Sequence, residues 1–131
     1  MKRLEDWPER LAAYVDAHRD TPFRWGQNDC ATFAAGAVEA ITGHAMEVPI
    51  VESAQDYAGF VADLGALRQH VADHLGEPLA SPAFARRGDV VLMLLDGRET
   101  LGVCIGAEAA APGASGVLTV PMSAASAAWR V

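Results

Sequence analysis

The spacing of apolar residues changes near residue 87, and this change constrains the fold more than any other feature. Before it, apolar residues recur at helical spacing. After it, residues 89–95 form a nearly continuous apolar run that ends at Asp96-Gly97. Such a run is typical of a buried strand, and Asp-Gly between two strands is a strong hairpin signal. Helices first and strands last, with no linker or repeat between them, predict one α+β domain over residues 1–131.

Four helices are expected, packed on a small antiparallel sheet formed by the last third of the chain. The first runs from Trp7 to about Ala17, with Asp6 as its N-cap. Another runs from Cys30 to about Thr42 and is rich in alanine, so we expect it to pack closely on the sheet. The remaining two are predicted over residues 53–63 and 66–75.

The return strand of the hairpin is predicted over residues 99–106. Alternation places Leu101 and Val103 on one face, and Thr100, Gly102 and Cys104 on the other. Glycine inside a strand often marks close approach of another element. We therefore expect the alanine-rich helix to lie over the glycine-bearing face, which would bring Thr100 near Cys30. Later features are a turn at 112–116, a strand at 117–120, a helical turn at Ser123 and a last strand at 129–131.

Composition excludes several classes of protein. The 131 residues carry a net charge of -7, which argues against nucleic acid or an anionic membrane as the main partner. No apolar run reaches the length of about 18 residues that membrane insertion requires, and the acidic N-terminal segment is unlike a signal peptide, so we expect synthesis in the cytoplasm. Two cysteines cannot build a disulfide framework.

The leading candidate for chemistry is Cys30, which follows Asp29 and opens the alanine-rich helix. Asp29 is a good N-cap, and the positive end of the helix dipole favours an anion at the next residue. A thiol placed there can have a pKa below its free value of about 8.5. The alternative is that Cys30 is a small apolar residue that starts a buried helix.

The motifs together resemble those of a known family. The chain carries, in order, Asn-Asp-Cys-Ala at 28–31, Arg-Gly-Asp-Val-Val at 87–91 and Leu-Gly-Val-Cys-Ile-Gly at 101–106. This order resembles the NlpC-like papain-fold peptidoglycan endopeptidases, which carry Asp-Cys-Ser-Gly, Gly-Asp-Leu-Val and His-Val-Gly-Ile-Tyr-Leu-Gly. From Trp25 onward the chain is more similar to a group of related phage-tail and prophage proteins that end in Ala-Trp-Arg-Val or a close variant. The resemblance implies a papain-like fold with Cys30 at the nucleophile position.

The chain departs from the enzymes at the general base. Aligned on the glycines, the histidine of the enzymes falls on Thr100, whose hydroxyl cannot accept a thiol proton near neutral pH. Ala31-Thr32 also replaces Ser-Gly, and no histidine follows His74. We therefore expect a structural component of a phage tail tip or tail assembly, located in the virion tail and contacting other tail proteins.

The alternative is an active cysteine endopeptidase that cleaves peptidoglycan stem peptides during infection. Cys30 would then be the nucleophile, and His44 or a group from a partner chain would be the base.

No cofactor or metal is expected. His70 and His74 have the spacing of two ligands on one helix face, but a third ligand is not evident. A solvated helix face is the simpler interpretation. A weaker possibility is that Cys30 and Cys104 lie close enough to share a redox or metal role. The three tryptophans are expected to be core or interface anchors.

Overall fold

In a computed structural model that describes residues 2–48, 51–60 and 65–131, the chain forms four α-helices followed by a five-stranded sheet. The helices are α1 (Trp7–Ala17), α2 (Cys30–Thr42), α3 (Ala54–Phe60) and α4 (Ala66–Leu75). The strands are β1 (Val90–Leu95), β2 (Arg98–Cys104), β3 (Glu108–Gly113), β4 (Gly116–Pro121) and β5 (Ala125–Trp129). Short 3₁₀ turns, η1 (Pro82–Phe84) and η2 (Met122–Ala124), flank the sheet. None of the helices in these ranges is long and apolar enough to cross a membrane.

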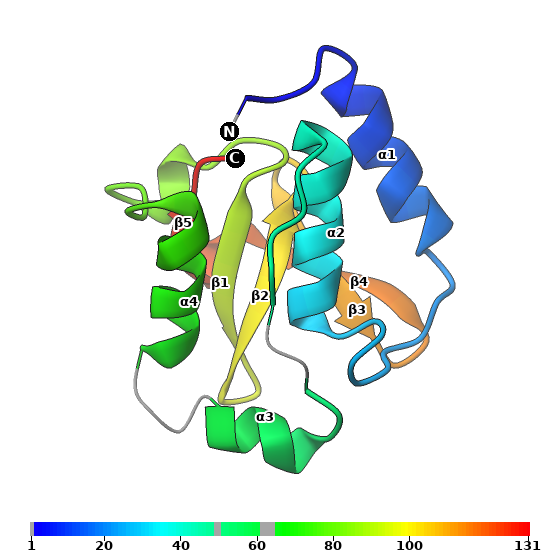
Figure 1. Ribbon diagram of the computed structural model, residues 1–131, viewed down its shortest axis with the longest axis vertical. Helices are drawn as coiled ribbons and strands as arrows, with labels where there is room; N and C mark the ends of the chain where they lie inside the picture. Colours follow the sequence, from blue (N-terminus) through cyan, green and yellow to red (C-terminus); the bar gives the residue numbers. More distant parts are fainter. Residues whose placement is uncertain (1, 49–50, 61–64) are drawn as a thin grey trace.

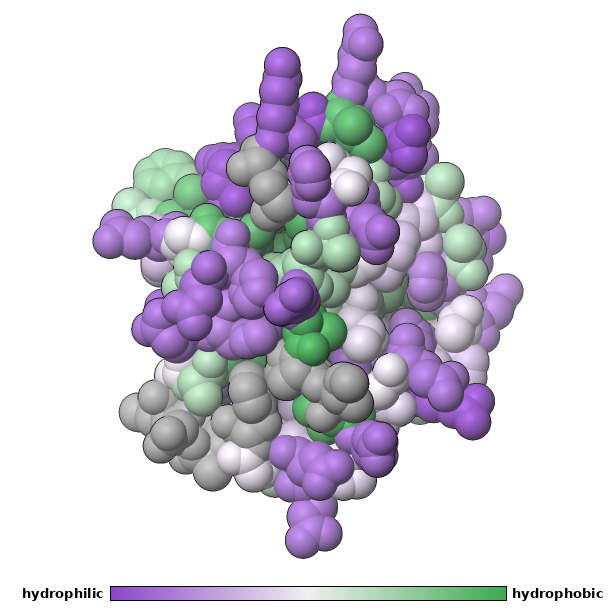
Figure 2. All heavy atoms as spheres, viewed as in Figure 1, coloured by the Kyte–Doolittle hydropathy of each residue, from purple (hydrophilic) through white to green (hydrophobic). Residues whose placement is uncertain are grey.

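Figure 1 shows α2 and α4 over one face of the sheet, with α1 packed against the outer side of α2. The strand order is β4-β3-β2-β1-β5, and every neighbouring pair is antiparallel. The α+β prediction, with N-terminal helices on a sheet formed by the C-terminal third, is confirmed. Figure 2 shows hydrophilic residues over α4 and around the edge of this face, and pale to apolar residues over α2. The buried apolar residues of the helices share one cluster with residues of the sheet.

The hairpin between β1 and β2 forms at the predicted position. Asp96 and Gly97 have φ angles of 51° and 75°, so both central residues adopt the left-handed conformation of a type I′ turn. The two strands then pair without a bulge from Leu95↔Arg98 to Val90↔Val103. They form the centre of the sheet, against which α2 packs.

The helix predictions are largely confirmed. α1, α2 and α4 have the expected bounds, and α3 forms within the predicted 53–63, of which 61–63 lie outside the described residues. Gly43 ends α2 in the left-handed conformation, with φ 79°. The predicted N-cap of α1 is wrong in its chemistry: the Asp6 carboxylate makes no capping hydrogen bond and pairs instead with Arg10 on the same helix, 2.8 Å away.

One strand was not predicted, and the predicted turn at 112–116 and last strand at 129–131 are wrong in their bounds. Residues 108–113 form β3, although Glu-Ala-Ala-Ala-Pro-Gly has low strand propensity. This strand forms because β2 and β4 pair with it on either side. Its three alanines are small enough to be fully buried in the sheet. The last strand covers 125–129 instead of 129–131, and Arg130 and Val131 bind Asp89 instead.

The sheet separates two apolar clusters, and α2 lies on the opposite face of β2 from the one expected. Leu101 and Val103 belong to the cluster formed with α2, whereas Cys104 belongs to the cluster on the far side. Gly102 makes room there for the neighbouring strand, since a Cβ at this position would lie 2.7 Å from Cε of Met93. The same Cβ would lie 2.8 Å from the carbonyl oxygen of Ala110 on β3, so the glycine marks close approach of a strand and a methionine side chain and not of a helix.

Gly36, the glycine of α2, makes room for a neighbouring helix. A Cβ at Gly36 would lie 2.2 Å from the hydroxyl oxygen of Tyr14, which donates a hydrogen bond to the carbonyl oxygen of Phe33, 2.8 Å away. Gly36 thus allows α1, rather than the sheet, to approach α2 closely. Burial raises the pKa of Tyr14 to about 12, with a smaller contribution from the charge of Glu39.

Candidate functional site

Asp29 caps the start of α2, as the sequence predicted. One oxygen of its carboxylate accepts a hydrogen bond from the backbone N–H of Thr32, and the Thr32 hydroxyl accepts one from the backbone N–H of Asp29, both at 2.9 Å. This reciprocal pair is a capping box. The other carboxylate oxygen accepts from the N–H of Gly26 at 2.9 Å. Asp29 is buried and satisfied on both oxygens, so its role is to hold the turn that precedes Cys30.

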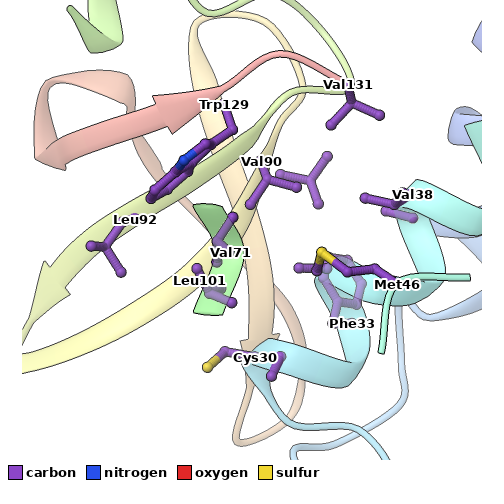
Figure 3. Close-up of a cluster of buried hydrophobic side chains, with 14 of the residues drawn as sticks. Cys30, Phe33, Val38, Met46, Val71, Val90, Leu92, Leu101, Trp129 and Val131 are labelled. Carbon is purple, nitrogen blue, oxygen red and sulfur yellow. The ribbon is translucent and has the colours of Figure 1, made fainter. Parts of the chain in front are cut away.

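Cys30 is the first residue of α2, and its side chain is buried. Only 6% of the residue is exposed, and Figure 3 shows it at the helix start within the apolar cluster that contains Leu101. Burial is the largest influence on the pKa of the Cys30 thiol, and it raises that pKa. The direction of this shift favours the alternative that Cys30 is a small apolar residue at the start of a buried helix, because desolvation disfavours the thiolate.

Tyr57 is the side chain that covers the sulfur, and the sequence analysis did not single it out. Its hydroxyl oxygen lies 3.8 Å from Sγ of Cys30 and accepts from the thiol, while its own proton is donated to the carbonyl oxygen of Glu99. Tyr57 is 4% exposed, and burial raises the pKa of its phenol above the usual value. A phenol that stays protonated cannot serve as a general base near neutral pH.

Aromatic side chains extend this cover toward the surface. The ring of Trp25 lies 5.4 Å from that of Tyr57, and the ring of Phe23 lies edge-on to Trp25 at 4.6 Å. The Arg98 guanidinium stands 5.9 Å from the centre of the Trp25 ring. Trp25 packs against the main core, in agreement with its predicted role as an anchor.

A surface hollow of about 540 Å³ lies next to the Tyr57 side chain that covers Cys30. It lies between α3 and the β1–β2 hairpin, and its lining includes Tyr57, Arg98 and Glu99 but not Cys30. Tyr57 therefore separates the sulfur from the hollow. Access to Cys30 along this route requires the Tyr57 side chain to move.

Thr100 does not face the sulfur. It pairs with Met93 across the β1–β2 ladder, and its hydroxyl donates to the carbonyl oxygen of Arg98 at 3.2 Å. Because alternate residues of a strand point to opposite faces, Thr100 shares the face of Gly102, while Leu101 faces α2. The expectation that Thr100 lies near Cys30 is wrong, because the helix covers the other face of β2.

The histidines do not complete a catalytic pair in the described chain. His44 is exposed just beyond the last turn of α2, so about 20 Å of helix separates it from Cys30. His18 stacks on Tyr14, with ring centres 4.3 Å apart, and its Nδ1 lies 2.8 Å from the carbonyl oxygen of Tyr14. The side chain hydrogen-bonded to the sulfur is the Tyr57 phenol.

The two metal hypotheses can also be placed. His70 and His74 lie on one face of α4 with ring centres 4.9 Å apart, and Nε2 of His70 is 2.9 Å from the carbonyl oxygen of Glu47. Within the described ranges, no three His, Cys, Asp or Glu residues are grouped so that they could hold a metal ion. Cys30 and Cys104 are free thiols in clusters on opposite faces of the sheet, so a shared role for them is wrong.

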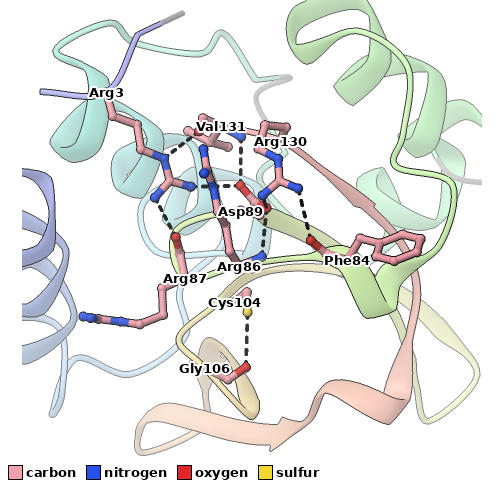
Figure 4. Close-up of polar contacts among 9 residues, drawn as sticks. All are labelled: Arg3, Phe84, Arg86, Arg87, Asp89, Cys104, Gly106, Arg130 and Val131. Carbon is pink, nitrogen blue, oxygen red and sulfur yellow. Dashed lines mark hydrogen bonds and ion pairs between the residues drawn. The ribbon is translucent and has the colours of Figure 1, made fainter.

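A second polar centre surrounds Asp89, which the sequence analysis placed only at the start of a strand. Asp89 is fully buried, and Figure 4 shows its carboxylate between Arg3 and Arg130, each 2.9 Å away. The backbone N–H groups of Arg86 and Val131 donate to the same carboxylate at 3.0 Å. These bonds join both ends of the chain to the start of β1, so Asp89 acts in stability.

These features describe an α+β domain with a capped helix start and a buried thiol. A family described as a domain of unknown function (DUF6950) matches residues 2–131, so the chain belongs to this family. No curated protein matches the sequence. What the site does is therefore argued from Cys30 and its surroundings.

Proposed function

We propose that the protein is a structural component of a phage or prophage tail, built on an NlpC-type papain-like scaffold that lacks peptidase activity. The order of the sequence motifs supports this proposal, and so does a helix that begins at Cys30 and packs against the central strands. Its partners would be other tail proteins, at the tail tip or during its assembly.

The observation that carries the loss of activity is the environment of the Cys30 sulfur. The thiol is buried, its pKa is raised by that burial, and the side chain bonded to it is a phenol whose pKa is raised as well. A cysteine peptidase needs a thiolate, a base that accepts its proton, and an acid that protonates the leaving amine. Tyr57 supplies none of these near neutral pH, and it also covers the atom that would attack.

Digestion of purified peptidoglycan tests this part of the proposal. We expect wild-type protein and Cys30→Ala to release no stem-peptide fragments above a buffer blank, with a known endopeptidase as the positive control. Thr100→His should remain inactive as well, because position 100 points away from the sulfur. Fragment release by the wild-type protein that disappears in Cys30→Ala would overturn the proposal.

The tail assignment is tested in the phage or prophage that encodes the chain. We expect deletion of its gene to abolish infectious particles, and a copy carrying Cys30→Ser to restore the wild-type titre. Antibody against the protein should label the tails of purified particles. Unlabelled tails together with full infectivity of the deletion would exclude a role in the tail.

The hollow beside Tyr57 favours a second candidate, an active cysteine endopeptidase with Cys30 as nucleophile. In that case Tyr57 would move aside and a partner chain would bring the base. Peptidoglycan digestion by assembled tails that is lost in Cys30→Ser tails, with isolated protein inactive, would support this candidate over the first.

A further inference from the structure

An apolar groove runs along α1, away from the thiol. Its volume is about 540 Å³, and it lies where the helix stands beside β4 and the end of β2. Leu11 and Val15 form the helix side, whereas Ile105 and Val117 form the sheet side. Apart from the buried Leu11, these side chains are only partly buried, so the groove presents apolar surface to solvent.

The two ends of the groove differ in charge. Near the C-terminal end of α1, Arg19 pairs with Asp16, which leaves that end neutral. At the other end, Arg87 lines the groove, with its guanidinium 5.8 Å from the ring centre of Trp7. Figure 4 shows this side chain directed away from Asp89 and toward α1. Within the described residues, no carboxylate is paired with Arg87.

Other arginines strengthen the positive charge at this end. Arg3, Arg86 and Arg130 gather there around the single side-chain carboxylate of Asp89. Two of these guanidinium groups, those of Arg3 and Arg130, pair with Asp89, whereas the Arg87 guanidinium points away from Asp89 and toward α1. This local excess of positive charge favours an acidic group beside the apolar floor.

We propose that this groove is the docking site for an extended segment of another protein that carries apolar residues and a carboxylate at the Arg87 end. The lining positions from Leu11 to Arg19 span about 12 Å at the rise of a helix, which matches about four residues of extended chain. The partly buried side chains of Val15 and Val117 supply affinity, and the Arg87 end sets the direction of the segment. The Cys30 site contributes no lining residue, so the inference depends neither on the thiol nor on the tail assignment.

Binding of a fluorescein-labelled peptide of alternating leucine and glutamate tests the proposal by fluorescence anisotropy. We expect saturable binding that weakens as salt is added, and no binding of the matching leucine-lysine peptide. Arg87→Glu should weaken binding at least about tenfold. The charge-matched control is Arg68→Glu on α4, which lies outside the groove and should leave the affinity unchanged.

A second pair of variants tests the apolar floor without disturbing the core. Ala12 is exposed and lines the groove, so Ala12→Trp should fill it and weaken binding at least about tenfold. Ala13→Trp places the same side chain on an exposed position outside the groove and should bind normally. Circular dichroism of both variants checks that they are folded.

Three outcomes would overturn the proposal. The first is the absence of saturable binding of the leucine-glutamate peptide. The second is equal binding by Ala12→Trp and Ala13→Trp. The third is self-association of the wild-type protein in sedimentation velocity that only Ala12→Trp removes, since the occupant would then be a second copy of the chain.

Discussion

The hydroxyl oxygen of Tyr57 lies 3.8 Å from the sulfur of Cys30, and its proton is donated to the carbonyl oxygen of Glu99. One side chain of α3 thereby connects the start of α2 to β2 and closes the space next to the thiol. This side chain separates the sulfur from the surface hollow, and burial of the sulfur raises the pKa of the thiol.

Removing this cover should expose the thiol. We expect Tyr57→Ala to raise the rate of Cys30 alkylation by iodoacetamide about five- to a hundredfold. The thiol reacts only when the structure around it opens, and a decrease of about 1–3 kcal/mol in the free energy of this local opening raises the open population by about that factor. The rate is measured by mass spectrometry of the Cys30 peptide in native buffer. Tyr57→Phe keeps the ring and should react nearly as slowly as the wild-type protein. Equal rates for Tyr57→Ala and wild type would show that Tyr57 does not cover the thiol.

Alkaline pH should destabilise the fold. Burial raises the pKa of Cys30 and of Tyr57 above their usual values. In the unfolded chain these groups ionise near pH 8.5 and 10, whereas in the folded chain they stay neutral to higher pH. The unfolded state therefore loses protons first, and the free energy of unfolding falls as pH rises above about 8.5, by up to about 1.4 kcal/mol per pH unit for the thiol.

Urea unfolding from about pH 7 to about pH 10 measures this effect. Cys30→Ser should show a smaller decrease than the wild-type protein, and the difference between the two isolates the thiol. A free energy of unfolding with the same pH dependence in both would contradict the raised pKa. Above about pH 10 both Tyr14, whose pKa is raised to about 12, and Tyr57 add to the decrease, so Tyr14→Phe should show a smaller decrease there than the wild-type protein.

Asp89→Asn changes the shape of the side chain little, but it should destabilise the protein strongly. The carboxylate is fully buried between Arg3 and Arg130, and asparagine would remove the negative charge from both guanidinium groups and turn an NH2 donor toward one of them. We expect a loss of about 3–5 kcal/mol in the free energy of unfolding, measured with urea. Asp6→Asn breaks an exposed pair that solvent screens, so it should leave the free energy of unfolding nearly unchanged. Similar losses in the two variants would refute the structural role of Asp89.

The parts of the fold that local chemistry determines could be predicted. α1, α2 and α4 follow from apolar spacing and from stop signals such as Gly43, and the β1–β2 hairpin follows from Asp96-Gly97. The alanine-rich β3 could not be predicted, because its strand conformation depends on pairing with β2 and β4, which the local sequence does not encode.

The site, like the fold, could be predicted only where it depends on residues that are neighbours in the sequence. Asp29 and Cys30 are neighbours, and a capped helix start is a local pattern. Tyr57 lies 27 residues beyond Cys30, and only the docking of α3 brings the two together. Alternation assigned Thr100 and Leu101 to opposite faces of β2, but it does not state which face a helix covers. The sequence therefore carried no signal for the position of Tyr57 or for the face of β2 that α2 covers.

Gly36→Ala should destabilise the protein, although alanine is the better helix former. In an open helix this exchange stabilises by up to about 1 kcal/mol, but here the new Cβ would lie 2.2 Å from the Tyr14 hydroxyl, which is held by its bond to Phe33. We expect a loss of about 1–3 kcal/mol in urea unfolding, since α1 must shift to relieve the overlap. Gly59→Ala is the matched control, because Gly59 lies in α3 and a Cβ there would meet no atom within 4 Å. That variant should be as stable as the wild-type protein or more so. A stabilising effect of both substitutions would mean that α1 and α2 are not held at the close distance that Gly36 permits.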